Sequence, residues 1–135
     1  MGQYYKIVNV TKKQYINPAA FGSGYKLMEF ASDGCSAMTG LAVLLANSNG
    51  RGGGDLCSDN EVVGSWAGDR IVIAGDYAGF GDPGEPDTED NLYLQCSNYS
   101  DSGYEDISAQ VISAMCDDDF WKAELEANPF AELPN

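Results

Sequence analysis

One segment constrains the fold more than any other. Residues 36–47, SAMTGLAVLLAN, are apolar on almost every side of a helical projection. Four positions follow the i, i+3, i+4, i+7 spacing of one helical face, namely Met38, Leu41, Ala42 and Leu45. Val43 and Leu44 extend the apolar surface to the other side, which leaves little for solvent. Such a helix is stable only when other elements cover it, so we expect a buried central helix that Asn49–Gly50 stops.

Strand patterns occur on both sides of this segment. Aromatic and β-branched residues partly alternate over residues 3–10, and a short extended piece is expected at Tyr15–Ile16. Residues 25–30, YKLMEF, alternate well enough to predict a further strand. Residues 70–75 contain the continuous run Ile71–Ile73 between Gly-Asp pairs, which is typical of a core strand.

The C-terminal third is predicted to be helical. An apolar face over residues 107–115 predicts one helix with Asp106 or Ser108 as its N-cap, and the acids at 117–119 separate it from a second helix before Pro129. Strands and helices are mixed without a regular βαβ order. We therefore predict one α+β domain over residues 1–135, a small mixed sheet packed on a buried central helix with two C-terminal helices.

Charge is the strongest global signal. The formal net charge is −14, with four lysines and no acid in residues 1–28 but 21 acids and three cations in residues 29–135. Such a surface repels nucleic-acid phosphates and attracts basic protein surfaces, although acidity also serves solubility. We therefore expect a basic surface of another protein as the partner, with no direct contact to nucleic acid.

The candidate partner-binding residues are the acids of two runs. They are Asp82, Glu85, Asp87, Glu89, Asp90, Asp117, Asp118 and Asp119. We expect these two runs to build one acidic face. The runs could also hold a cation, but neither has the spacing of a calcium-binding loop, and solvated loops with a negatively charged helix start are sufficient to explain them.

The glycine-rich stretch NGRGGGD, residues 49–55, is a second candidate site. It lacks the Lys-Ser/Thr of a P-loop and the last glycine of a dinucleotide fingerprint, and it follows a helix where a phosphate loop would precede one. Asp69 and Asp76 flank the strand at 70–75, so a small-ligand site is an alternative to turn-forming aspartates. Its candidate residues are Arg51, Asp69, Arg70 and Asp76; on the structural interpretation, Arg70 pairs with a nearby acid.

Several classes of function lack support. The chain has no histidine, so Ser-His and Cys-His catalysis is excluded and no catalytic residue is assigned. The four cysteines are widely scattered, which favours mostly buried free thiols over a zinc site. No metal or cofactor is expected. No apolar run is long enough to span a membrane and no signal peptide is recognised, so we expect a cytoplasmic protein.

Four blocks, MGQYYKIVN, KLMEF, NGRGGGDL and GSWAGDRIVIAGDYA, resemble those of a group of small proteins from bacteria and their phages. The resemblance implies a compact domain and a bacterial or phage setting, and it transfers no catalytic residue. We therefore predict a small acidic, non-enzymatic protein-binding module, one version of which is a host-defence inhibitor that mimics nucleic acid. The alternatives are a small-ligand or nucleotide-binding protein, with or without enzymatic activity, and a structural or assembly protein.

Overall fold

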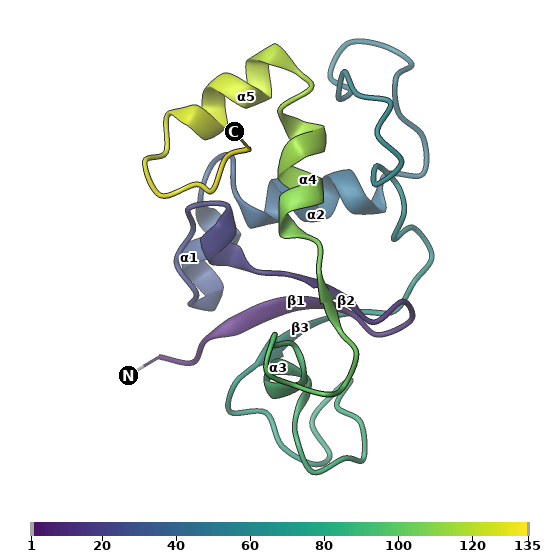
Figure 1. The fold of residues 1–135 in the computed structure, drawn as a ribbon, viewed down its shortest axis with the longest axis vertical. Coiled ribbons are helices and arrows are strands. Elements are labelled where there is room, and N and C mark those ends of the chain that lie inside the picture. The colour runs from purple at the N-terminus through teal and green to yellow at the C-terminus, as the bar shows by residue number, and fades with distance from the viewer. Residues whose placement is uncertain (1, 135) are drawn as a thin grey trace.

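A four-stranded sheet divides the molecule into two unequal layers (Figure 1). A computed structural model describes residues 2–134 of the chain. The strands are β1 (Tyr5–Asn9), β2 (Gln14–Ile16), β3 (Ile71–Gly75) and β4 (Glu105–Asp106), in the order β3-β1-β2-β4. β1 is antiparallel to β2 and β3, whereas β2 and β4 are parallel. The predicted mixed sheet of an α+β fold is therefore confirmed.

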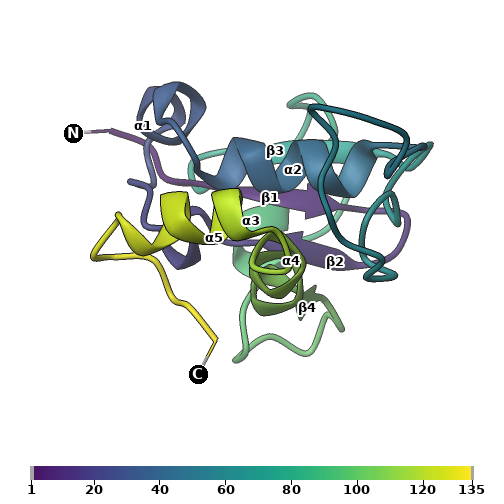
Figure 2. The same ribbon diagram turned by 90° about the horizontal axis from the view of Figure 1, so that it is seen from above.

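Helices cover the sheet on both faces, as the view from above shows (Figure 2). One face carries α1 (Leu27–Ser32), α2 (Ala37–Leu45), α4 (Ser108–Met115) and α5 (Asp119–Glu126), together with the 3-10 turn η1 (Pro18–Ala20). α3 (Leu92–Gln95) lies on the other face. The predicted central helix and both C-terminal helices are present.

Alternation along the central strand produces two hydrophobic cores. Ile7 of β1 faces the larger helical layer, where the main core contains Phe21, Phe30, Leu44 and Trp66. Val8 faces the other way, into a smaller core. The smaller core consists of Val8, Tyr15, Ala74, Leu92 and Cys96. Since successive side chains of a strand point to opposite faces, β1 needs apolar residues at consecutive positions.

The prediction for residues 36–47 is correct in type, although the buried face differs. The buried residues of α2 are Ala37, Gly40, Leu41 and Leu44, whereas Ala42 and Leu45 are exposed. Gly40 decides this orientation, because a Cβ there would lie 2.7 Å from the ring of Phe21. A helix that is apolar all round offers several equivalent faces, and the closest fit to a neighbour selects one of them.

The end of α2 is closed by a distant segment. The carbonyls of Val43 and Leu44 accept hydrogen bonds from the backbone N–H groups of Gly64 and Trp66, each at 2.9 Å. Gly64 has φ +76°, and a Cβ there would lie 2.4 Å from the carbonyl oxygen of Ala46. The helix therefore ends at Leu45, before the predicted stop at Asn49–Gly50, because residues 64–66 satisfy its last carbonyls.

The predicted strand at residues 25–30 is wrong: residues 27–30 are the first part of α1. The Glu29 carboxylate accepts a hydrogen bond of 3.1 Å from the backbone N–H of Lys26, as in a capping box. Phe30 is the one buried residue of this helix, and it enters the main core. A pattern of alternating apolar and polar residues over only six positions does not distinguish a strand from a short helix that buries a single side chain.

The segment at 70–75 is a strand, as predicted, but it is not a core strand. β3 lies at the edge of the sheet, and Ile73 is 37% exposed. The continuous β-branched run arises because Val72 packs on the smaller core and Ile71 on the main core. The expectation of mostly buried thiols also fails, since only Cys96 is buried among the four free cysteines of residues 2–134.

Candidate functional site

The four candidate ligand-binding residues lie in three places. Asp69 and Arg70 precede β3, Asp76 follows it at the opposite end of this strand, and Arg51 lies on the loop after α2. The Asp76 carboxylate accepts a hydrogen bond of 3.0 Å from the backbone N–H of Tyr4. The strand between Asp69 and Asp76 holds the two acids apart, so they do not face a common ligand.

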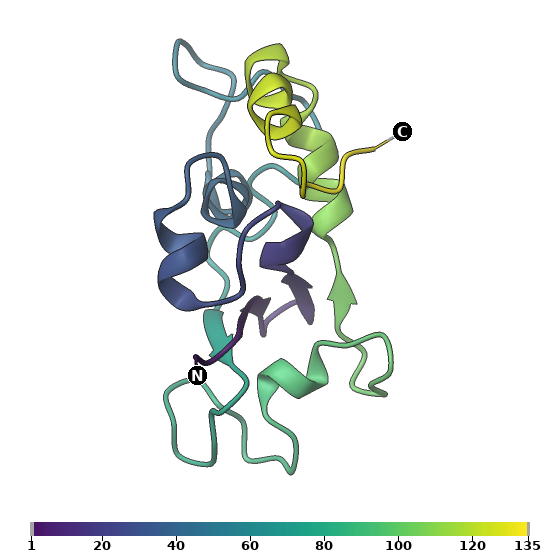
Figure 3. The ribbon, with the colours of Figure 1, turned by 90° about the vertical axis from the view of Figure 1, so that its left-hand side faces the viewer.

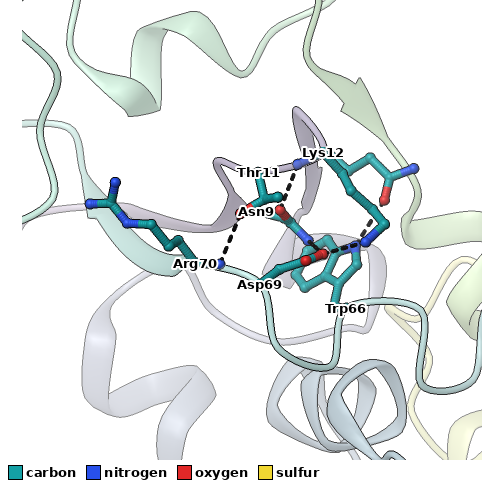
Figure 4. Close-up of polar contacts among 7 residues, drawn as sticks. Asn9, Thr11, Lys12, Trp66, Asp69 and Arg70 are labelled. Atoms are coloured by element: carbon teal, nitrogen blue, oxygen red, sulfur yellow. Dashed lines mark hydrogen bonds and ion pairs between the residues drawn. The ribbon is translucent and has the colours of Figure 1, made fainter.

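Asp69 belongs to a polar network at the turn between β1 and β2 (Figure 4). Its carboxylate accepts a hydrogen bond of 2.9 Å from the buried Asn9 side-chain amide and forms an ion pair with Lys12. The side-chain oxygen Oδ1 of Asn9 in turn accepts a hydrogen bond of 2.8 Å from the Lys12 backbone N–H. The backbone N–H of Arg70 donates to the Thr11 hydroxyl at 3.0 Å. The network thus fixes the β1–β2 turn to the start of β3.

The partner of Asp69 is Lys12 rather than Arg70. The expectation that Arg70 pairs with a nearby acid is wrong, since Lys12–Asp69 is the single ion pair within residues 2–134. Figure 4 shows the Arg70 side chain pointing away from Asp69. Hydrogen bonds from Asn9 and Lys12 lower the pKa of the Asp69 carboxyl. A carboxylate held in its charged form in this way suits a structural role better than proton transfer.

The glycine loop is closed at its base by Asn49. The Asn49 side chain accepts from the Leu56 N–H and donates to the Leu56 carbonyl, both at 2.8 Å. At the tip, the Asp55 carboxylate accepts a hydrogen bond of 2.7 Å from the backbone N–H of Arg51. The exposed Arg51 guanidinium forms no ion pair within the described part of the chain.

A small pocket lies beneath this loop. Its volume is about 200 Å³, and Gly54, Asp55 and Leu56 form one wall. The rest of the lining is mainly apolar and includes Val43, Val63, Met115 and Trp121. Sequence reasoning missed this pocket because its walls come from segments that are far apart in the chain, between Thr39 and Trp121.

The two acidic runs lie at opposite ends of the molecule. Residues 82–90 are in the loops below the sheet in Figure 1, whereas residues 117–119 join α4 to α5 at the top. The upper run is tied to its surroundings. The Asp118 carboxylate accepts hydrogen bonds from the backbone N–H groups of Cys57 and Phe120, at 2.9 and 3.0 Å, and Asp117 accepts from the Ser58 hydroxyl. The single acidic face expected from both runs therefore does not form.

The lower run belongs to a larger surface, which we call the acidic lobe, residues 76–104. This segment contains seven acidic residues and no lysine, arginine or histidine. Four large apolar side chains of the lobe are exposed: Tyr77 (67%), Phe80 (85%), Leu94 (52%) and Tyr99 (98%). Asp87, Glu89 and Asp90 are also exposed. The lobe thus combines negative charge with aromatic surface.

Lysines of the N-terminal segment attach the acidic lobe to the sheet. The Lys6 ammonium donates to the carbonyls of Tyr93 and Cys96 at the end of α3, and it lies 4.2 Å from the centre of the Tyr93 ring. The Lys13 ammonium donates to the Ser102 carbonyl at 3.2 Å. Burial lowers the pKa of Lys6. The excess of lysines in residues 1–28 was the only sequence signal for these contacts.

The cysteines and the other acidic side chains are the remaining candidates for a metal centre or a reactive thiol. Within residues 2–134, no three His, Cys, Asp or Glu side chains gather as a metal site would require. Burial raises the pKa of the Cys96 thiol to about 12 and also raises those of Cys35 and Cys116. Thiols with raised pKa values are poor nucleophiles near neutral pH. No helix in this part of the chain is long and apolar enough to cross a membrane.

Comparison with protein families, curated proteins and solved structures finds no match to this chain. The function is therefore inferred from the residues and contacts described above.

Proposed function

We propose that this chain is a non-enzymatic protein-binding module that docks through its acidic lobe onto a basic surface of another protein. The observation that carries the proposal is the lobe itself, in which seven acids and four exposed apolar side chains occupy one continuous segment. Negative charge attracts a basic partner from a distance, and exposed aromatic side chains supply contact area once the two proteins meet.

The aromatic component favours a protein partner over a purely solubilising role. Phe80 and Tyr99 are almost fully exposed. Charge alone would keep the chain soluble without such side chains. Buried tyrosine and phenylalanine side chains are frequent at the centre of protein interfaces, where they contribute most of the binding free energy.

A nucleic-acid-binding groove is a basic surface of the required kind. An acidic module from a phage would compete there with nucleic acid and so inhibit a host-defence protein. The resemblance of the sequence blocks to bacterial and phage proteins supports this version of the proposal, and the charge of the lobe supports the competition.

The test is affinity capture from a bacterial lysate at 0.1 and 1 M salt, where the Debye length falls from about 10 to about 3 Å. We expect the partner to be retained only at low salt. The lobe variant Asp87→Asn/Glu89→Gln/Asp90→Asn should no longer retain the partner at low salt. The matched variant Glu124→Gln/Glu126→Gln/Glu132→Gln, which removes three charges from α5 and the C-terminal tail, should keep it. Equal retention at both salt concentrations, or equal loss in both variants, would contradict the proposal.

The pocket under the glycine loop favours a second candidate function, the binding of a small apolar ligand. Its volume of about 200 Å³ suits a molecule of the size of a single aromatic ring system. A thermal-shift screen with small aromatic compounds, nucleotides and divalent cations tests this function. A ligand at 100 times its Kd adds about 2.7 kcal/mol to the free energy of unfolding, so binding should raise the Tm. The absence of any shift would count against a ligand-binding role.

A further inference from the structure

The outer edge of β3 presents backbone groups that no other strand pairs. The Val10 N–H donates to the Arg70 carbonyl, and the Asp76 N–H donates to the Tyr4 carbonyl. In an antiparallel pair the hydrogen-bonded positions alternate, so with this register the even-numbered residues of β3 face β1. The N–H and C=O groups of Ile71 and Ile73 therefore point away from the sheet, and within residues 2–134 they have no hydrogen-bond partner.

This edge lacks the features that usually protect an edge strand. The opposite edge, β4, has only two residues, and both are acidic. β3 has five residues, Ile-Val-Ile-Ala-Gly, with neither a charge nor a proline. Folded proteins normally blunt a free edge with charges, prolines or bulges because it readily pairs with another strand. An apolar, unprotected edge is therefore a candidate surface for strand addition.

The surroundings of the edge define what fits there. Figure 3 shows α1 above β3 and the acidic lobe below it. Ile73, on the helical side of the sheet, is 37% exposed. On the other side Gly84 of the acidic lobe closely approaches the Val72 side chain. A strand added to β3 would thus place alternate side chains toward Ile73 and toward the acidic lobe.

We propose that the partner inserts an extended segment that pairs with Ile71 and Ile73 and continues the sheet beyond β3. The segment alternates apolar residues, which contact Ile73, with basic residues, which face the acidic lobe. This inference rests on the proposed function and names the part of the partner that is recognised. Charge complementarity selects a basic segment over a second copy of the chain, since each copy carries a net charge of −14.

The probe is the peptide acetyl-Val-Lys-Val-Lys-Val-Lys-amide, added at low salt to isotopically labelled protein. In the free protein the amides of Ile71 and Ile73 should exchange with solvent rapidly, while those of Val72 and Ala74 are protected by β1. Bound peptide should slow exchange at Ile71 and Ile73 by about ten-fold or more. The control peptide acetyl-Pro-Lys-Pro-Lys-Pro-Lys-amide has the same charge but lacks alternate N–H groups, and it should give no such protection.

Two variants keep the test decisive. Ile73→Pro removes an outward N–H without removing a hydrogen bond to β1, and protection is then measured at Ile71. Ile73→Lys places a cation on the edge should the proline variant not fold. Each should abolish the protection, whereas Phe130→Lys, which adds a cation at an exposed site in the C-terminal tail, should keep it. Absence of peptide binding at low salt, equal binding of the proline peptide, or binding that leaves Ile71 and Ile73 unprotected would each overturn strand addition. The proposed function would survive these results if lysate capture still depended on salt and on the lobe acids.

Discussion

At the scale of single residues, Asn9 has the most consequential role. Its side chain is fully buried and connects the Lys12 backbone to Asp69. A buried amide that bridges two segments is costly to remove, because the Lys12 backbone N–H loses its side-chain acceptor and Asp69 loses one of its donors.

We therefore expect Asn9→Ala to reduce the free energy of unfolding by about 1–3 kcal/mol. Urea denaturation followed by tryptophan fluorescence, to which the buried Trp66 contributes, would measure the change. The control is Asn98→Ala, which removes an exposed amide. Its free energy of unfolding should differ from that of the parent by no more than about 0.5 kcal/mol. If both variants were equally stable, the network in Figure 4 would not hold the turn.

Asp69 should make stability depend on pH in a defined direction. Its folded pKa is lowered below the ordinary value of 3.8 by Asn9 and Lys12. Its contribution is therefore fully present above the unfolded pKa and is lost as the pH falls through the folded pKa. Asp69→Asn should be less stable than the parent at pH 7, and the difference should close below pH 3.8. Denaturation curves between pH 7 and pH 3 test this, with Asp87→Asn as the exposed control; a constant difference would contradict it.

At the scale of elements, the contact between α2 and η1 depends on Gly40. Alanine is a better helix former than glycine by about 1 kcal/mol, yet a Cβ at this position would lie 2.7 Å from the Phe21 ring and 3.2 Å from Val111. Because the core has no room for the added methyl group, steric overlap outweighs helix propensity.

Gly40→Ala should accordingly destabilise the protein by up to about 2 kcal/mol, the overpacking cost of about 1–3 kcal/mol less the propensity gain of about 1 kcal/mol. Gly52→Ala is the matched control, since a Cβ there meets no atom within 4 Å. It should change stability by no more than about 0.5 kcal/mol. Thermal unfolding of the two variants provides the comparison, and a stabilised Gly40→Ala would show that Phe21 can move aside.

Several elements were predictable from local sequence because their signals are local. Asp118 accepts from the Phe120 N–H as the N-cap of α5, and Val111, Ile112 and Met115 line the buried face of α4. The edge position of β3 was not predictable, since a local pattern does not report how many neighbours a strand has. For the same reason Asp69 was recognised as a candidate but its partner Lys12, 57 residues away, was not.

At the scale of the whole molecule, the net charge of −14 opposes compaction. Like charges repel more strongly in the folded chain than in the expanded one, and salt screens that repulsion.

We expect the Tm to rise when NaCl is increased from 0.02 to 0.3 M. A gain of ~1 kcal/mol corresponds to about 3–5 °C for a chain of this length. The Asp87→Asn/Glu89→Gln/Asp90→Asn variant, with three fewer charges, should show a smaller rise. Differential scanning calorimetry would measure both, and a Tm that falls with salt would mean that the Lys12–Asp69 pair outweighs the general repulsion.

The sequence by itself determined the kind of most elements, although not that of α1, and it determined the sign of the surface charge, because periodicity, capping and ionisation are properties of short segments. Only the tertiary structure decided which side of α2 is buried, that β3 lies at an open edge, and that the two acidic runs lie at opposite ends. These outcomes depend on contacts between residues distant in the chain, such as Gly40 with Phe21 and Asp69 with Lys12. The glycine loop illustrates both cases. Its position after a helix was predictable from the sequence, whereas the pocket beneath it forms only when α2, α4 and α5 pack together.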